Sequence, residues 1–541
     1  MTRGGDLGDI ARRRLEFLPG AGARTPGDRA MLVMILLIAA VFRLWHVTQP
    51  LVDAFSWREA STAMMADNFR TGSWNIFYPE VSWTGPGPSY QGREFQILSY
   101  IAAALHAVFG WHDWLGRLVA VFFGLVTVYA LHRLAAQIWD ERHAHAAALI
   151  YALMPGPIAI DSSFLPDPAM LALVTLGLWL FARYWTRGGG WTLLLATAAF
   201  TLGALAKLPG LSAGLAVLWL VAVWLARGQW WRAAPTLIAT VAGLAVILAY
   251  YAWAVHLGNS YPPYHVAGTG YLWQDGLAGF IGNGFYFEDL WDIAVWWFCG
   301  YPVLLLAGVG LWMAPARPSG ARDRALAMVP QAWLMGTLLV YLVAAREVTA
   351  NPWNLHMAFG PVALFCGRGL IVLVEMGRTP FSGVPGMSRA GTLVLAVLLF
   401  SSLPLTQELK RPQAEQARLL GQKLDVLAGP DDLVIAIAPE VGDPIGVYYS
   451  RRRGWVFPPG GGESDWSRFE DDDAIAIAQL EELRARGARW FGVAQNARDR
   501  AGRPFFEHHA GVVEYLNTTA TFVEKTDDYV IYRLSEAGGG S

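Results

Sequence analysis

Residues 235–256 read PTLIATVAGLAVILAYYAWAVH and contain no Asp, Glu, Lys or Arg. A helix needs about 17–25 apolar residues to cross the roughly 30 Å hydrocarbon core of a bilayer, so this stretch is long enough to span a membrane. Ten further apolar runs occupy residues 30–48, 115–136, 143–160, 168–185, 191–206, 209–226, 293–313, 325–344, 355–375 and 390–405. The chain is therefore predicted to be a polytopic α-helical membrane protein with about 11–13 transmembrane helices.

The composition of the 541 residues agrees with this class of protein. Hydrophobic residues make up 54% and charged residues 16%, whereas soluble domains carry about 25% charged residues. The net charge of -2 gives no basic surface for a nucleic acid, so no nucleic-acid partner is expected. The two cysteines exclude a secreted disulfide scaffold, and the 13% of aromatic residues excludes a disordered chain.

The charged residues divide the chain into parts. They are sparse in the predicted membrane domain, residues 30–405, and dense in residues 406–537. Short apolar runs in the second part predict strands at 433–438, 489–493, 519–523 and 529–534, and an amphipathic stretch predicts a helix at 474–486, which indicates a small soluble α/β domain. Residues 1–29 are predicted to be a cytoplasmic tail, and residues 538–541 a flexible end or a cloning remnant.

Arginines give the sidedness of the predicted spans. Every loop on one side carries at least two arginines, whereas the loop at 257–292 on the other side has no Lys or Arg. Because positive residues favour the cytoplasmic side, the outer segments are predicted at residues 49–94, 161–167, 257–292 and 345–354. The run at 95–109 fits as an interfacial helix, and the C-terminal domain is then extracytoplasmic. The expected location is a plasma membrane of the bacterial inner-membrane type.

Carboxylates follow two of these spans on the outer side. Asp53 and Glu59 lie six residues apart with Arg58 between them, and Asp167 precedes Pro168 at the start of a span. A carboxylate at the lipid–water boundary can act as a general base on a hydroxyl group. Asp53 and Asp167 are also suited to capping the helices that follow them, and the sequence alone leaves both roles open.

Basic and polar residues on the same side are candidate substrate ligands. Lys207 is the only lysine before residue 405, and it lies on the outer side, against the positive-inside bias. It is either a phosphate ligand or a lysine whose amine reaches the interface. Arg93 and Glu94 precede the interfacial helix, and Arg346 and His356 flank the outer loop at 347–354. An arginine there would suit a lipid phosphate, whereas His356 is equally an ordinary polar residue at a span entrance.

No cofactor is predicted with certainty. The sequence has no Walker loop, no dinucleotide-binding glycine pattern and no Cys/His spacing of a zinc site. A divalent cation remains a possible ligand, because Asp53, Asp167 and His356 are of the types that bind one.

Several short motifs follow one another along the segments that are predicted to lie on the outer side of the membrane. They are the acid after the first span, Gly-Arg-Glu-Phe at 92–95, Phe-Gly at 109–110 before Arg117, Leu-Pro-Asp-Pro at 165–168 and Ala-Lys-Leu-Pro at 206–209. This order resembles the GT-C integral membrane glycosyltransferases. Within that class the chain is similar to the dolichyl-phosphate-mannose protein mannosyltransferase and aminoarabinose-transferase family, glycosyltransferase family 39.

The resemblance implies a function at the outer membrane face. It implies a polyprenyl-phosphate-linked sugar donor and a lipid, glycan or protein acceptor, with inverting transfer to an acceptor hydroxyl. Asp53 matches the expected catalytic carboxylate and Asp167 the second acid, although Ala54 stands where many relatives have another acid. Arg93-Glu94 replaces the Lys-Pro-Pro of the aminoarabinose branch, which argues against that sugar.

Two other functions compete with this interpretation. A transporter or flippase of lipid-linked saccharides would need ionisable residues at the bilayer midplane, and the predicted spans hold few of them. A non-catalytic protein of envelope assembly would not need Asp53, Asp167 and Lys207 to converge on one cavity.

Overall fold

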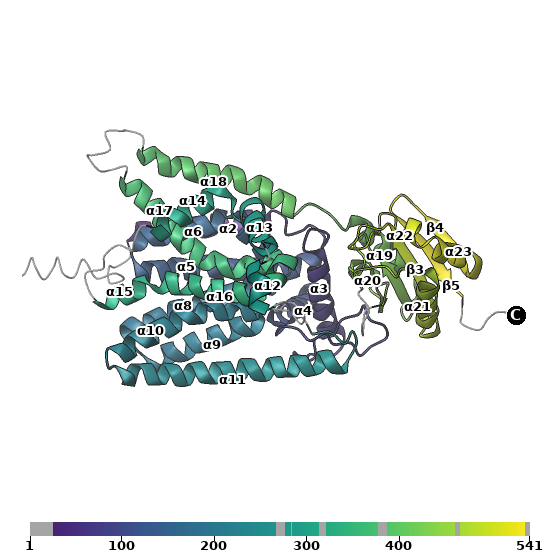
Figure 1. Cartoon of the computed structure of the whole chain (residues 1–541), viewed down its shortest axis with the longest axis horizontal. Helices are drawn as coiled ribbons and strands as arrows, with labels where there is room; N and C mark the ends of the chain where they lie inside the picture. Colours follow the sequence, from purple (N-terminus) through teal and green to yellow (C-terminus); the bar gives the residue numbers. More distant parts are fainter. Residues whose placement is uncertain are drawn as a thin grey trace, which may run out of the picture.

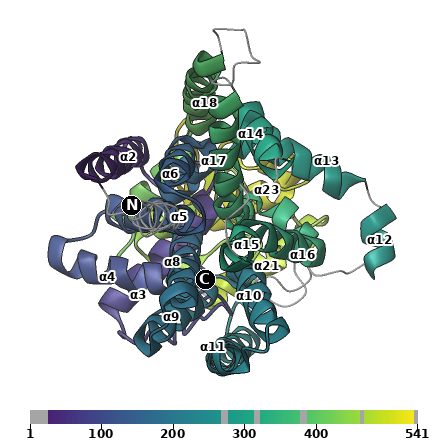
Figure 2. The same ribbon diagram turned by 90° about the vertical axis from the view of Figure 1, so that its left-hand side faces the viewer.

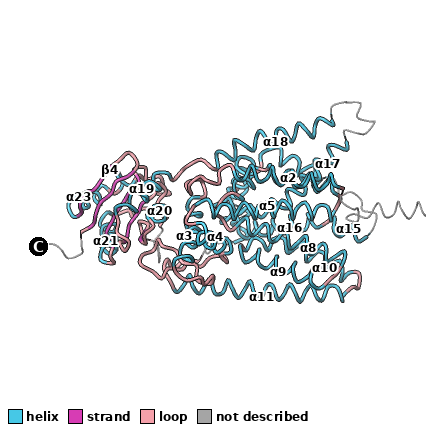
Figure 3. Tube along the Cα trace, turned by 180° about the vertical axis from the view of Figure 1, so that it is seen from behind, coloured by secondary structure: helices cyan, strands magenta, loops and turns pink. Residues whose placement is uncertain are grey.

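The computed structural model describes residues 25–266, 276–282, 284–312, 321–376, 387–459 and 466–535. Figure 1 shows an elongated molecule in which a helical bundle carries a small α/β domain at one end. Figure 3 shows that the strands lie in that C-terminal domain and that helices make up the bundle. The predicted cytoplasmic tail up to residue 24, the part of the outer loop at 267–275 and residues 538–541 lie outside the described residues.

The bundle is built from helices that run along its long axis (Figure 1). Their bounds are α2 (Pro26–Leu44), α5 (Asp113–Ile138), α6 (Glu141–Leu153), α7 (Pro155–Asp161), α8 (Asp167–Arg187), α9 (Gly190–Ala206), α10 (Gly214–Ala226), α11 (Trp230–Ser260), α14 (Gly300–Trp312), α16 (Val329–Ala350), α17 (Phe359–Met376) and α18 (Met387–Leu409). Figure 2 looks along this bundle from the end opposite the C-terminal domain, with α12 (Gly276–Gly282) and α13 (Phe285–Asp292) standing away from its centre. The predicted class, a polytopic α-helical membrane protein, is confirmed.

The number of described helices that meet a length-and-composition criterion for a span is smaller than the predicted 11–13. Among the described residues, six helices are long and apolar enough to cross a membrane, or up to eight if each of two bent pairs is one span. The difference lies in the shorter helices. Helix α9 has 17 residues, and α2 carries Asp28, Arg29 and Arg43 within its 19 residues.

Two predicted spans are bent rather than straight. The run at 143–160 forms α6 and α7, which meet at 66°, because Pro155 lacks the N–H that would continue the first helix. The run at 293–313 is divided between the helical segment Tyr286–Phe298 and α14, with a bend of 112° at Gly300, whose φ is +73°. The first span begins at Pro26 rather than residue 30, because Thr25 and Asp28 form a capping box there.

Helices α3 (Ser56–Thr71) and α4 (Ile97–Phe109) lie between the bundle and the C-terminal domain (Figure 1). Helix α3 confirms the predicted helical stretch after the first span. Helix α4 is apolar but only 13 residues long, as expected of a helix that does not cross the bilayer.

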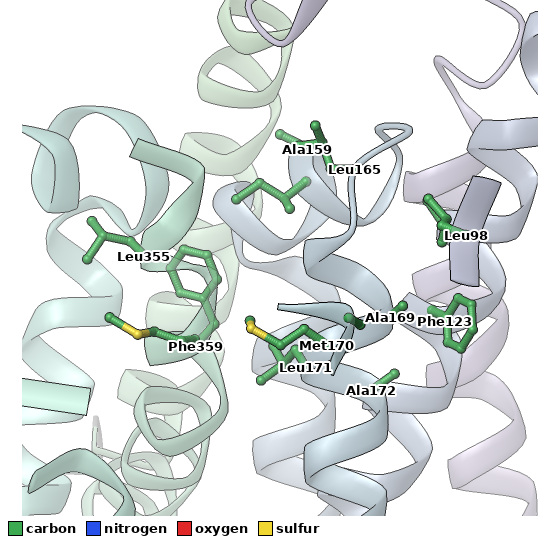
Figure 4. Close-up of a cluster of buried hydrophobic side chains, with 14 of the residues drawn as sticks. Leu98, Phe123, Ala159, Leu165, Ala169, Met170, Leu171, Ala172, Leu355 and Phe359 are labelled. Atoms are coloured by element: carbon green, nitrogen blue, oxygen red, sulfur yellow. The ribbon is translucent and has the colours of Figure 1, made fainter. Parts of the chain in front are cut away.

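The start of α8, which carries Asp167, is packed on two sides. Figure 4 shows residues 169–172 of α8 between Leu355 and Phe359 on one side and Leu98 and Phe123 on the other. All of these side chains are buried, and such burial contributes about 25 cal/mol per Å² of apolar surface. The packing fixes the position of Asp167 at the end of the bundle.

The C-terminal domain is a five-stranded sheet with helices packed against it. Its elements are α19 (Glu415–Leu427), β1 (Leu433–Ile437), α20 (Ile445–Ser450), β2 (Gly454–Trp455), α21 (Asp473–Ala485), β3 (Ala488–Ala494), α22 (Phe505–His508), α23 (Ala510–Thr519), β4 (Ala520–Lys525) and β5 (Tyr529–Leu534). The strand order is β2-β1-β3-β5-β4, with β1 parallel to β2 and β3 and β5 antiparallel to β3 and β4. The four predicted strands and the helix are present, whereas the two-residue strand β2 was too short to predict.

The C-terminal domain is attached to the end of the bundle that carries the first loop. The hydroxyl groups of Tyr448 and Tyr449 donate to the carboxylate of Asp113 at 2.8 and 2.6 Å. The backbone N–H of Gln413 donates to the carbonyl of Val52 at the start of the first loop. The C-terminal domain and the first loop therefore lie on the same side of the helical bundle, as the sidedness of the predicted spans requires.

A buried carboxyl group at this junction should make stability depend on pH. Asp443 accepts hydrogen bonds from Ser56 Oγ at 3.1 Å and from the Ile445 N–H at 2.9 Å. Burial, with a contribution from Glu440, raises the pKa of Asp443 from 3.8 to about 7. The folded state then binds more protons than the unfolded state between these two values, so stability falls as the pH rises through this window.

We therefore expect Asp443→Asn to be more stable than the wild type at about pH 8 and similar to it at about pH 5. The measurement is the thermal unfolding midpoint of the purified protein in detergent across this pH range. Asp431→Asn, an exposed position in the same domain, is the control and should follow the wild type. Parallel pH curves for Asp443→Asn and the wild type would contradict the assignment.

Candidate active site

Four charged side chains form a buried network at the end of the bundle that faces the C-terminal domain. This network, the Arg117 cluster, consists of Asp53, Glu59, Arg117 and Lys410. Arg117 donates to Asp53 Oδ2 at 2.8 Å and to both oxygens of Glu59 at 3.0 and 2.7 Å. The Nζ of Lys410 lies 3.2 Å from the same oxygen of Asp53. All four side chains are fully buried, so their charges are compensated within the cluster and not by water.

Asp53 is held in this cluster as a carboxylate. Burial alone would raise its pKa, but Lys410 and Arg117 outweigh burial, and the pKa lies below its usual value. A lowered pKa weakens a general base. Asp53 also does not cap α3, because the N-cap position is Phe55, although the Phe55 N–H donates to Asp53 Oδ1 at 3.0 Å.

A second group of charges, the Lys207 cluster, consists of Arg58, Glu94, Asp167 and Lys207. Lys207 Nζ lies 2.8 and 2.9 Å from the two oxygens of Asp167, and Arg58 Nη2 lies 2.5 Å from Glu94 Oε2. The Phe95 N–H donates to the Leu205 carbonyl, which brings the segment of Glu94 to the end of α9.

The Lys207 cluster is more open to solvent than the Arg117 cluster. The side chains of Arg58 and Glu94 are each 12% exposed and that of Lys207 is 8% exposed. Burial would raise the pKa of Glu94, but Arg58 and Lys207 outweigh it and lower that pKa. An anion that binds Arg58 and Lys207 would replace the carboxylates as their partner. The pKa of Glu94 would then rise, because the two cations would lower it less, and Glu94 would become a stronger base.

Comparisons with known proteins agree with this architecture. A family model described as dolichyl-phosphate-mannose-protein mannosyltransferase matches residues 97–253. The oligosaccharyltransferase AglB of Archaeoglobus fulgidus, in complex with an inhibitory peptide and a dolichol-phosphate, aligns with a TM-score of 0.62 at 12% identity over 94% of this chain and 74% of its own. ArnT from Cupriavidus metallidurans, bound to undecaprenyl phosphate, aligns with 0.60 at 12% identity over 94% and 98%. This chain has the GT-C fold.

Further comparisons agree with the GT-C fold. The arabinofuranosyltransferase AftD from Mycobacteria aligns with a TM-score of 0.55 at 14% identity, over 96% of this chain and 41% of its own. No curated protein matches the sequence. The predicted resemblance in fold is confirmed, and the roles of the individual residues have to be argued from their geometry.

An apolar cavity lies inside the GT-C bundle, and part of its wall comes from the segment that directly follows Lys207. Its volume is about 400 Å³, and its walls come from α8, α9, α10, α11 and α16 together with the 3-10 helix η1 (Leu208–Ala213). The lining is almost entirely apolar and includes Phe181, Phe200, Leu211, Leu218, Ile247 and Val340. Helix α8 begins with Asp167, α9 ends directly before Lys207 and η1 begins directly after it, so three elements that line the cavity start or end at the Asp167–Lys207 pair.

A second, polar cavity lies between α3 and the C-terminal domain. It has a volume of about 370 Å³, and its lining includes Asp67, Arg70, Trp111, Tyr448 and Arg451. The guanidinium of Arg451 lies over the Trp111 ring, 4.2 Å from its centroid. A polar wall with an aromatic face is suited to binding a saccharide or another polar group.

Arg93, Arg346 and His356 are not members of the Lys207 cluster. Arg93 is buried and its Nε donates to Gln91 Oε1. Arg346 is exposed in the last part of α16. His356 Nε2 lies 3.1 Å from Asp161 Oδ1, so His356 belongs to a third, buried group around Asp161.

The cation site considered from the sequence is not assembled in this fold. Asp53, Asp167 and His356 each have a different partner: Arg117, Lys207 and Asp161. Within the part of the chain that the structure describes, no ion pair or hydrogen bond joins the three to one another. Among the described residues, the His, Cys, Asp and Glu side chains that come together with metal-like spacing are His132, Glu141 and His145, at a different place in the bundle.

Sequence reasoning missed several residues of these clusters. Arg117 and Lys410 complete the Arg117 cluster, and Glu347 and His265 interact electrostatically with Arg58. An arginine inside an apolar run is a signal of function or pairing, and Arg117 carries that signal. Lys410 and His265 occur in polar segments of the sequence. The sequence alone does not distinguish them from ordinary surface residues.

Proposed function

We propose that this protein is a membrane glycosyltransferase that transfers a sugar from a polyprenyl-phosphate donor to an acceptor hydroxyl at the outer membrane face, with inversion at the anomeric carbon. The observation that carries the proposal is the Lys207 cluster, where two cations are paired with carboxylates and Lys207 directly precedes η1, a helix that lines an apolar cavity. The lipid phosphates bound by the structural neighbours ArnT and AglB support the same substrate class.

The donor is proposed to bind across the cluster and the cavity. Arg58 and Lys207 bind the donor phosphate, and the exposed Arg346 is a third candidate ligand. The polyprenyl chain enters the apolar cavity, whose lining matches a hydrocarbon. Since Arg93 donates to Gln91, we assign it to shaping the loop that carries Glu94.

Transfer then needs one base and a stabilised leaving group. The acceptor oxygen attacks the anomeric carbon, and the bond from that carbon to the phosphate oxygen breaks with its electron pair on phosphate. The acceptor proton passes to a carboxylate of the cluster, for which Glu94 is our first candidate and Asp167 the second. The polyprenyl phosphate gains one negative charge, which Lys207 and Arg58 stabilise.

Asp53 is proposed to position this site rather than to take the proton. It shares Arg117 with Glu59, and Glu59 in turn accepts the Phe164 N–H at 2.7 Å. This chain of contacts links the first loop to the segment just before Asp167.

The orientation in the membrane is part of the proposal. Residues 30–405 form the catalytic membrane domain, and residues 406–537 form an extracytoplasmic domain over the outer loops. The polar cavity between α3 and the C-terminal domain is the proposed entrance for a lipid, glycan or protein acceptor. A bacterial inner membrane fits this arrangement.

A donor screen tests the proposal directly. Purified protein in detergent is offered a series of polyprenyl-phosphate sugars, and mass spectrometry follows the release of polyprenyl phosphate and the formation of a glycosylated product. We expect turnover with at least one donor and loss of that turnover in Lys207→Met. Turnover that is unchanged in Lys207→Met would remove the cluster from the mechanism.

Asp53→Asn separates the two possible roles of Asp53. If Asp53 positions the site, the variant should lower the thermal unfolding midpoint, because Arg117 and Lys410 lose a shared anion. Its transfer rate per folded molecule should fall less than about tenfold, below the 10²–10⁴-fold effect of a lost base. A folded Asp53→Asn protein with a loss in that larger range would make Asp53 the base.

A further inference from the structure

Three side chains of the types that bind metal ions come together at the other end of the bundle from the Lys207 cluster. His132 is near the end of α5, and Glu141 and His145 lie one turn apart at the start of α6. One ligand atom from each of the three residues lies within 4.8 Å of the other two. Arg117 and His132 share helix α5, and at 1.5 Å per residue they are roughly 22 Å apart along it.

The distances in this group match those between ligands of one metal ion. His132 Nε2 lies 3.0 Å from His145 Nδ1 and 3.6 Å from Glu141 Oε2. Zinc binds histidine nitrogen and carboxylate oxygen at about 2.0–2.2 Å, and a tetrahedron of that size separates its ligand atoms by about 3.3 Å. The two measured separations lie on either side of this value.

Asp28 supplies the contact that orients one of the ligands. His145 Nε2 lies 3.4 Å from Asp28 Oδ1, while the other ring nitrogen, Nδ1, points towards His132. A proton on Nε2 that faces the carboxylate leaves the lone pair of Nδ1 for a metal. Carboxylate–histidine–metal arrangements of this kind fix the ring and strengthen the ligand.

We propose that His132, Glu141 and His145 bind a divalent transition-metal ion, with zinc as the best fit, and that Asp28 orients His145. Two imidazoles and one carboxylate suit zinc and its neighbours, whereas Mg²⁺ prefers oxygen ligands. The side chain of His132 is 1% exposed, and those of Glu141 and His145 are 30% and 19% exposed. The ion can thus enter from the solvent side, and water completes its coordination.

The bound ion would join three helices. His132 belongs to α5, Glu141 and His145 belong to α6, and Asp28 belongs to α2, which packs against both of the others. In the proposed orientation this is the cytoplasmic side. The site would stabilise the bundle end independently of the transferase reaction at the outer face.

Metal binding is measured on the full chain, purified with an affinity tag that contains no histidine and treated with a chelator. We expect one equivalent of Zn²⁺ by elemental analysis, and the visible absorption of tetrahedral Co²⁺ on titration with cobalt. His145→Gln and Glu141→Gln should each lower the affinity by at least about 10-fold, and Asp28→Asn by about 10–100-fold. His112→Gln, the same change at an exposed position beside the start of α5, is the matched control and should bind like the wild type.

A second measurement covers variants that fail to fold. Zn²⁺ should raise the thermal unfolding midpoint of the wild type and of His112→Gln, because a ligand that binds only the folded state stabilises it, and Mg²⁺ should leave it unchanged. A wild type that binds no Zn²⁺ and shows no thermal shift would overturn the proposal. Equal Zn²⁺ binding by His145→Gln and His112→Gln would overturn it too.

Discussion

Replacing Glu94 by Gln is expected to reduce sugar transfer by about 10²–10⁴-fold, the usual contribution of a general base. The amide keeps the size of the side chain and can still accept a hydrogen bond from Arg58, but it cannot take the acceptor proton. The effect should appear in kcat, because Arg58 and Lys207 remain to bind the donor phosphate. The measurement is the initial rate of product formation with a saturating donor, followed by mass spectrometry.

Glu80→Gln is the matched control for this variant. Glu80 is another acid of the first loop and is paired with an arginine, with Arg453 Nη1 at 2.8 Å. It should retain activity close to that of the wild type. If Glu94→Gln keeps its rate and Asp167→Asn loses it, the base is Asp167 and the role of Glu94 is limited to holding Arg58.

The second large effect is expected at Arg117, and it concerns stability. Arg117→Met removes the cation that Asp53 and Glu59 share and leaves Glu59 as a buried carboxylate without a cation in direct contact. Removing one partner of a buried ion pair costs about 3–5 kcal/mol. We expect little folded protein, measured as the monodisperse fraction after gentle heating in detergent.

A double variant distinguishes this cause from a simple loss of packing. In Arg117→Met/Glu59→Gln the remaining acid, Asp53, still has Lys410 at 3.2 Å, so part of the folded fraction should return. Arg411→Met provides the exposed comparison, because the side chain of Arg411 is 71% exposed and its pair with Glu408 spans 3.7 Å. Surface pairs contribute about 0–1 kcal/mol, and this control should resemble the wild type.

Hydropathy and arginine placement predicted the class of the fold, because the bilayer requires long apolar helices whatever their detailed packing. Hydropathy and arginine placement did not predict the bends in two of the spans. A hydropathy average over residues 143–160 does not register that Pro155 interrupts one helix and starts another. In the C-terminal domain a short apolar run predicted β5 with its observed bounds, and five of the six residues of that strand are buried.

The candidate site was predictable in its residue types but not in its pairings. Lys207 was singled out because a lone lysine on the outer side opposes the charge bias, and it does meet Asp167. The sequence suggested that Asp53, like Lys207, faces a substrate. Its charged partners are Arg117 and Lys410, which lie 64 and 357 residues further along the chain. Long-range ion pairs of this kind depend on how the helices pack, which a local pattern does not specify.

The place where the chain leaves the bundle has a consequence for dividing the protein into modules. Lys410 lies one residue beyond the end of α18, yet its ammonium group pairs with Asp53 of the first loop. The N–H groups of Gln413 and Ala414 both donate to the carbonyl of Val52. A cut at residue 405, where the sequence changes in character, would strip the membrane half of a cation and two backbone donors. A self-sufficient membrane half would therefore have to extend to at least Ala414, and exchange of the C-terminal domain between relatives should join the chains beyond that point.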